Sequence, residues 1–131
     1  MKLNHLIVAA LLPACFLTGS ISNADRQTYG TATISRTTLT GIGPDQKVSR
    51  RDPSDIIKVG NLYYVWYSRG PVKTGYNATV WYATSVDGVN WTEKGRAVAK
   101  GAVGAWDEAS VFTPNILVAE GKYWLFYTAI S

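Results

Sequence analysis

The chain has 131 residues, enough for one domain, and its hydrophobic content of 47% is that of a globular protein. The net charge of +4 is dispersed along the sequence, with Arg50-Arg51 as the one basic doublet. This charge pattern is too weak for a nucleic-acid-binding surface, so we expect no nucleic-acid partner.

Residues 1–24 have the basic start, the apolar core and the small-residue cleavage site of a secretory signal peptide, the cleavage site being Ser22-Asn23-Ala24. The apolar run is too short for a membrane span. An alternative is lipidation at Cys15, because Leu12-Pro13-Ala14-Cys15 resembles a bacterial lipoprotein box. Both forms predict export to the periplasm or the cell exterior.

The single cysteine, Cys15, and the single histidine, His5, both lie in this leader. A disulfide framework, a cysteine or histidine metal site and histidine-based catalysis are therefore excluded for the rest of the chain. Acid–base chemistry must come from Asp, Glu, Tyr or Lys. We expect no cofactor and no bound metal.

Residues 25–49 are polar, rich in Thr, Gly and Ser, and lack a helical period, which predicts a connector or wrapping arm. Short runs rich in aromatic and β-branched residues follow, separated by turn signals such as Gly60-Asn61 and Asp87-Gly88. These runs predict strands at residues 54–59, 62–68, 78–85, 91–98, 111–119 and 122–128. The pattern favours an all-β sandwich, barrel or propeller.

An internal repeat decides among these folds. A shift of 60 residues aligns Tyr63 with Tyr123 and Trp66 with Phe126, and the surrounding residues agree in class. Four strands per repeat are typical of a propeller blade, so the chain holds about one and a half blades. A five-bladed ring of this period needs on the order of 300 residues, which predicts that the chain is the N-terminal part of a longer protein.

Asp52 carries most of the functional hypothesis. It precedes Pro53, which biases it toward an extended conformation and holds it on a rigid element. The alternative is an Asp-Pro turn whose carboxylate caps a backbone N–H. Strand alternation predicts that Asp55 faces the other way. The 60-residue shift aligns Asp52 with Phe112, so the carboxylate does not recur.

The motif Arg51-Asp52-Pro53-Ser54, followed by Tyr63-Tyr64 and by residues 81–91, resembles the five-bladed β-propeller glycoside hydrolases of families 43, 62, 32, 68 and 117. Residues 106–116 fit best with family 117, the α-1,3-(3,6-anhydro-L-galactosidase) enzymes of agar breakdown. The resemblance covers residues 50–131. It implies a partial five-bladed propeller that hydrolyses plant or algal polysaccharide with Asp52 as general base.

The resemblance leaves two alternatives open. In a fructosidase like those of families 32 and 68, Asp52 would be the nucleophile. In the second alternative, the chain is a noncatalytic carbohydrate-binding or remnant propeller fragment, because the general acid of the related enzymes comes mostly from later blades.

Four further residues are candidates for substrate binding. Arg51 lies beside the base, where it binds a sugar hydroxyl or lowers the pKa of Asp52, or is simply solvated. Trp106 forms a sugar-stacking wall or packs in the core. Asp107 and Glu108 line the central funnel or serve as turn carboxylates.

Residues 85–91 resemble the Asp-box of sialidases, with one residue fewer between Asp87 and the glycine. This motif predicts a structural role, in which Asp87 caps the turn and Trp91 packs beneath it.

Overall fold

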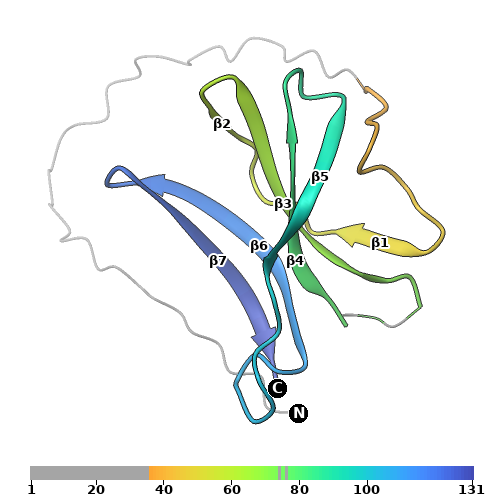
Figure 1. The fold of residues 1–131 in the computed structure, drawn as a ribbon, viewed down its shortest axis with the longest axis vertical. Coiled ribbons are helices and arrows are strands. Elements are labelled where there is room, and N and C mark those ends of the chain that lie inside the picture. The colour runs from red at the N-terminus through yellow and green to blue at the C-terminus, as the bar shows by residue number, and fades with distance from the viewer. Residues whose placement is uncertain (1–35, 74, 76) are drawn as a thin grey trace, which may run out of the picture. The chain divides into compact units, whose positions relative to one another are not determined.

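A computed structural model describes residues 36–73, 75 and 77–131 (Figure 1). The predicted signal peptide, the lipidation site and the first part of the predicted connector, residues 25–35, lie outside these residues. The described part consists of strands and turns without any helix, and so contains none that could cross a membrane. The all-β prediction is confirmed.

The first sheet is an antiparallel meander with an interrupted edge strand. Strands β1 and β2 both pair with β3, at opposite ends of it, and β4 and β5 follow in order. The strands are β1 (Val48–Arg51), β2 (Ile57–Val59), β3 (Leu62–Pro71), β4 (Thr79–Ser85) and β5 (Trp91–Val98). Because β1 and β2 together occupy one position beside β3, these five strands form a four-stranded blade, as the repeat predicted.

The edge strand differs from the prediction in its bounds. Val48 and Ser49, assigned to the connector, already pair with the end of β3. The predicted strand at residues 54–59 begins as β2 only at Ile57, because Asp52–Ile56 bends away from regular pairing.

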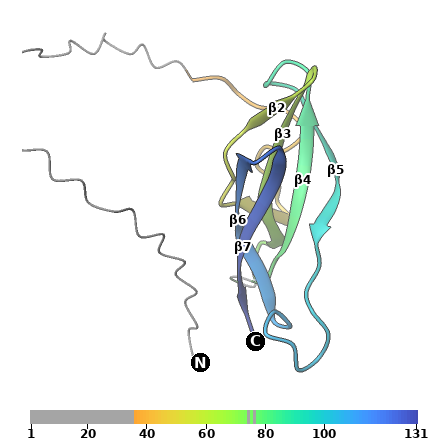
Figure 2. The same cartoon turned by 90° about the vertical axis from the view of Figure 1, so that its left-hand side faces the viewer.

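The second sheet is the hairpin of β6 (Ser110–Ala119) and β7 (Lys122–Ile130). It packs against β3 and β4 of the first sheet, as Figures 1 and 2 show. Hydrogen bonds join the sheets: Ala78 N–H donates to Ser110 Oγ at 2.9 Å, and Val111 N–H donates to the Ala78 carbonyl oxygen at 3.2 Å.

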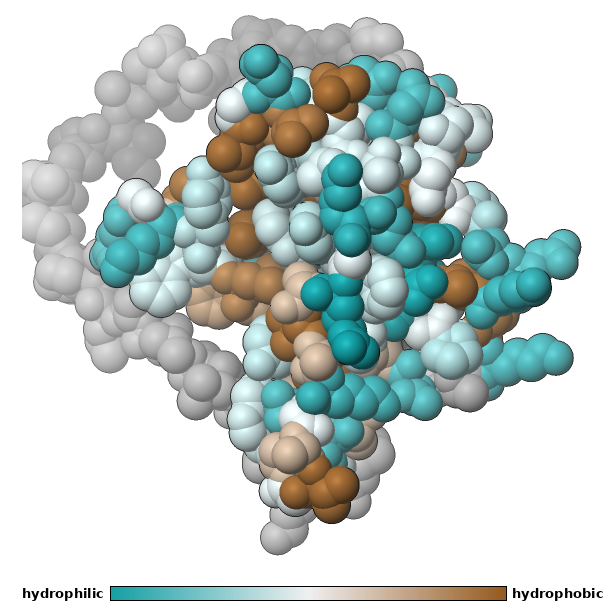
Figure 3. Space-filling view, viewed as in Figure 1, coloured by the Kyte–Doolittle hydropathy of each residue, from teal (hydrophilic) through white to brown (hydrophobic). Residues whose placement is uncertain are grey.

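Buried side chains lie on both faces of the first sheet. One face holds a cluster of Val65, Tyr67, Ala83 and Trp91, with Ile42 packed against it. Strand alternation puts Val80 on the other face, toward Val111 of the second sheet, and both are fully buried. Hydrophilic residues gather over β5 and on the side where β1 lies (Figure 3).

Candidate active site at the bend in the edge strand

Asp52 lies at the break in the edge strand. Pairing with β3 stops at Arg51, opposite Ser68, and resumes at Ser54, whose N–H donates to the Trp66 carbonyl oxygen at 2.8 Å. Between them Asp52 has a φ of 51°, in the left-handed region. The predicted extended conformation is therefore wrong. The interruption also removes the strand alternation from which the facing of Asp55 was predicted.

The carboxylate of Asp52 has an oxygen without a partner. Oδ2 is buried and accepts no hydrogen bond from any described residue. An unsatisfied buried polar atom costs about 1–3 kcal/mol, and more when it is charged. Such atoms and left-handed non-glycine backbones are both concentrated at functional sites. Asp52 combines the two features, which makes it the leading candidate for chemistry.

The second sheet repeats this bend. Thr113 has a φ of 47° and, like Asp52, precedes a proline. Pairing between β6 and β7 shifts register between Phe112 and Asn115, on either side of this Thr-Pro pair. Both sheets therefore interrupt an edge strand at a left-handed residue followed by proline.

Strand register gives the correspondence between the two bends. Phe112 lies opposite Thr128, as Arg51 lies opposite Ser68, and Asn115 lies opposite Phe126, as Ser54 lies opposite Trp66. The structural counterpart of Asp52 is thus Thr113, and the assignment of Phe112 from the 60-residue shift was wrong. The first sheet has one extra residue between its bend and β2, so the shift is 61 residues at the bend and 60 beyond it.

The two bends lie close together around Ser68. This serine is the pairing partner of Arg51, and its Oγ accepts a 2.8 Å hydrogen bond from Thr113 N–H. Ser68 is 1% exposed, so its hydroxyl bridges the sheets in the interior. Sequence reasoning missed Thr113; the signal that could have found it is the Thr-Pro pair, which mirrors Asp52-Pro53.

The other predicted site residues divide into two groups. Arg51 lies next to Asp52 and donates from Nε to Ser49 Oγ at 3.0 Å. Residues 106–108 belong to the loop after β5, which Figure 1 shows at the end of the molecule where the C-terminus lies. No interaction among the described residues joins this loop to Asp52, so the structure brings only Arg51 beside it.

The loop residues have local contacts. Trp106 is 65% exposed and stacks on Tyr127, with 5.9 Å between ring centroids. The backbone carbonyl of Asp107 accepts from Gly101 N–H at 3.1 Å, and Glu108 Oε2 accepts from Gly104 N–H. Asp107 and Glu108 therefore close the loop that presents the Trp106 ring to solvent.

Comparison with known proteins identifies the family. Residues 44–131 match the model of the glycosyl hydrolases family 32 N-terminal domain. The chain belongs to this family. The resemblance to the β-propeller glycoside hydrolases is thereby confirmed.

Among solved structures, the chain is similar to Zg3597, a family 117 glycoside hydrolase from the marine bacterium Zobellia galactanivorans, with 36% identity and a TM-score of 0.66 over 72% of this chain and 34% of that one. An N-acetylgalactosamine deacetylase from F. plautii, in complex with blood group B trisaccharide, shares the fold at 18% identity, with a TM-score of 0.55 over 71% of this chain and 27% of that one. The chain spans about a third of the length of these proteins. No curated protein sequence matches it.

The Asp-box of this family 32-type domain has the predicted structural role. Asp87 Oδ1 accepts from the N–H groups of Val89 and Asn90, both at 2.8 Å, and Trp91 Nε1 donates to the Gly88 carbonyl oxygen at 3.0 Å. Hydrogen bonds from the backbone and the side chain of Asn90 hold the pKa of Asp87 well below its usual range. The described residues of the domain contain no group of three or more side chains suited to bind a metal ion.

Proposed function

We propose that this chain is part of an exported glycosidase that hydrolyses O-glycosidic bonds of plant or algal polysaccharide, with Asp52 as the general base. The observation that carries the proposal is the buried, unpartnered Oδ2 of Asp52 at a left-handed bend. Oδ2 has no donor among the described residues, so a water or a sugar hydroxyl that reaches it replaces no hydrogen bond of the protein. Membership of a glycosyl hydrolase family supports that use of it.

Glycoside cleavage uses two carboxyl groups on opposite sides of the scissile bond. As general base, Asp52 takes a proton from the attacking water while an acid protonates the leaving oxygen. We assign the acid to none of the described residues, because Glu108 Oε2 accepts from Gly104 N–H and no interaction among the described residues joins the loop of Asp107 and Glu108 to Asp52. Arg51 is placed to orient the Asp52 carboxylate or to bind a hydroxyl of the same sugar.

The loop after β5 contributes a second contact in this proposal. Trp106 offers an exposed ring braced by Tyr127, which suits stacking against a sugar farther along the substrate. Asp107 and Glu108 then hydrogen-bond the hydroxyl groups of that sugar or only hold the loop.

Nucleophilic attack by Asp52 is the second candidate. The observation that favours it is the matching model itself, which describes family 32 rather than family 117. In this alternative Asp52 forms a covalent glycosyl intermediate, and the product retains its anomeric configuration. The configuration of the released sugar therefore separates the two roles.

The test is hydrolysis of neoagaro-oligosaccharides, arabinoxylan and fructans by the longer protein of which this chain is the proposed part, and by two variants of that protein. Asp52→Asn should lower kcat/KM by about 10³-fold or more, as expected for loss of a catalytic base. The matched control is Asp55→Asn, which removes an exposed carboxylate three residues away and should change kcat/KM less than about threefold.

Unchanged hydrolysis by Asp52→Asn would rule out both roles for this residue. A wild-type longer protein that binds one of these saccharides but hydrolyses none would instead establish the noncatalytic carbohydrate-binding alternative.

A further inference from the structure

A second candidate site lies on the first sheet, at the end where β3 finishes and β4 begins. It is a cavity of about 340 Å³, within the size range of small-molecule sites. Its lining contains four cationic side chains and no carboxylate; the cations are Lys47, Arg69, Arg96 and Lys100. We call it the cationic pocket. Asp52 is not part of its lining.

Strand register puts two of these charges on one face of the sheet. Trp81 lies opposite Arg96, and Arg69 lies on the same face because it alternates with Tyr67, which lies opposite Trp81. Arg69 on β3 and Arg96 on β5 therefore share a face with Trp81 on the strand between them.

The guanidinium of Arg69 is held in place without being fully bonded. Its Cζ lies 4.0 Å from the centroid of the Trp81 ring, and that ring is fixed by a 2.8 Å hydrogen bond from Nε1 to Thr79 Oγ1. The Nε of Arg69 is buried and makes no hydrogen bond to a described residue. A positioned guanidinium with spare donors is what binds carboxylate or sulfate oxygens strongly.

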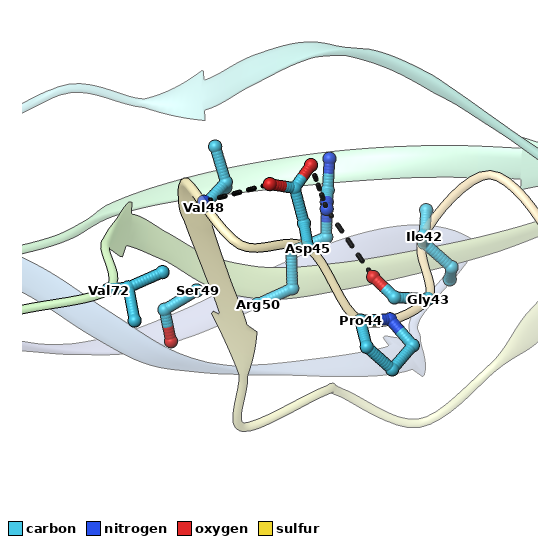
Figure 4. A pocket seen from close by; sticks show the side chains of 8 residues that line it. All are labelled: Ile42, Gly43, Pro44, Asp45, Val48, Ser49, Arg50 and Val72. Carbon is cyan, nitrogen blue, oxygen red and sulfur yellow. Dashed lines mark hydrogen bonds and ion pairs between the residues drawn. The ribbon is translucent and has the colours of Figure 1, made fainter.

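The nearby acids are occupied by other donors. Glu93 Oε2 lies 3.3 Å from Arg69 Nε, but it also lies 3.0 Å from Arg50 Nε and accepts from Tyr67 Oη at 2.8 Å. Asp45 is turned toward Arg50 and the backbone N–H of Val48, as Figure 4 shows. One shared carboxylate oxygen thus serves two arginines.

The other three cations of the pocket have fewer anionic partners than Arg69. Lys47 and Arg96 form no ion pair with any residue among 36–73, 75 and 77–131, and Lys100 reaches only the amide oxygen of Asn77. One sign of charge in a concave site focuses the electrostatic potential on whatever enters it.

We propose that the cationic pocket binds an anionic unit of a saccharide, namely a sugar bearing a sulfate ester or a uronate carboxylate. The anion would be held by Arg69, Arg96 and Lys100, while Asn77 and Thr79 offer polar groups to the sugar hydroxyls. Gly70 allows the end of β3 to pass close to the backbone of Asn77, since a Cβ there would lie 2.4 Å from the Asn77 carbonyl oxygen. The saccharide part of this inference rests on the proposed function, and the anion part does not.

The experiment is titration of the full chain with three oligosaccharides of equal length, one sulfated, one uronate-bearing and one neutral, followed by calorimetry and by the NMR signal of the Trp81 indole N–H. An anionic oligosaccharide should bind at least tenfold more tightly than the neutral one and shift the indole signal. The double variant Arg96→Gln/Lys100→Gln should weaken that binding at least tenfold. The tighter of the two anionic ligands identifies the natural group.

The matched control is Lys58→Gln/Lys122→Gln, which removes two charges that lie over the Tyr63 and Trp124 rings, outside the pocket. It should change the affinity less than twofold. An equal loss in both double variants would mean unspecific charge attraction and would overturn the proposal, as would tight binding of the neutral ligand or no binding of either anion. The two tests have separate readouts, hydrolysis for Asp52 and the Trp81 indole signal for the pocket, so a failure of the hydrolysis test and a failure of the pocket can be told apart.

Discussion

The two sheets carry the same bend with different side chains on it. Asp52-Pro53 in the first sheet and Thr113-Pro114 in the second both have a left-handed residue before proline, with φ values of 51° and 47°. At Thr113 the N–H and the hydroxyl both have partners: the N–H donates to Ser68 Oγ, and the hydroxyl donates to Thr128 Oγ1 at 2.6 Å. At Asp52 a carboxylate oxygen is buried without one.

This difference separates scaffold from chemistry. A left-handed conformation costs an L-residue about 1–2 kcal/mol, and it is especially unusual for a β-branched residue such as Thr113. Since the left-handed residue occurs in both sheets, the bend is part of the repeated structure and by itself does not indicate catalysis. The unsatisfied carboxylate oxygen occurs at only one of the two bends, which makes Asp52 the candidate for the reaction.

Removal of the hydroxyl that anchors the second bend should have the largest effect on stability. Ser68→Ala leaves Thr113 N–H without its acceptor in a part-buried position, which should lower the free energy of unfolding by roughly 1–2 kcal/mol. The control Thr128→Ala removes an exposed partner of the same residue and should cost about 0.5 kcal/mol or less. Urea denaturation of both variants measures the difference, and equal losses would show that the Ser68 bridge does not hold the bend.

Much of the frame was predictable from the sequence because its signals are local. The Gly60-Asn61 turn, the Asp87-Gly88 hairpin and the alternation along residues 78–85 each depend on a few neighbouring residues. The Asp-box was predictable for the same reason, since Asp87 caps a turn that its own neighbours form.

The bends were not predictable in the same way. Proline biases the preceding residue toward extended backbone, and that rule gave the wrong conformation for Asp52. Its left-handed φ accompanies pairing that resumes at Ser54 with a strand twelve residues away. The assignment of Phe112 as its counterpart failed because one extra residue in the first sheet is visible only in the pairing register.

Substitution of the bend residues themselves should change the free energy of unfolding less than Ser68→Ala does, and for Asp52 the change should be an increase. Asp52→Asn keeps the shape and tolerates the left-handed backbone, but it removes the buried charge, so we expect the free energy of unfolding to rise by about 1 kcal/mol. Thr113→Asn should change it by less than about 0.5 kcal/mol, because relief of backbone strain is offset by the lost Thr128 hydrogen bond. Thermal unfolding of the pair tests this. A loss of stability in Asp52→Asn would mean that the carboxylate caps the structure, as in the Asp-Pro turn alternative.

The smallest effect should be an acid response confined to the first sheet. Because the folded-state pKa of Asp87 lies below its ordinary value of 3.8, its contribution to stability is complete above that pH and declines as the pH falls further. The difference in Tm between wild type and Asp87→Asn should therefore be constant above pH 5 or so and shrink from about pH 4 toward pH 2. The control Val86→Ala, an exposed neighbour in the same turn, should give a difference in Tm that does not vary with pH.

Amide NMR signals show where in the molecule this acid response lies. The signals of Val89 and Asn90 should broaden in acid before those of Phe112 and Thr113. Simultaneous loss of all four signals would mean that the two sheets unfold as one unit and share the acid sensitivity.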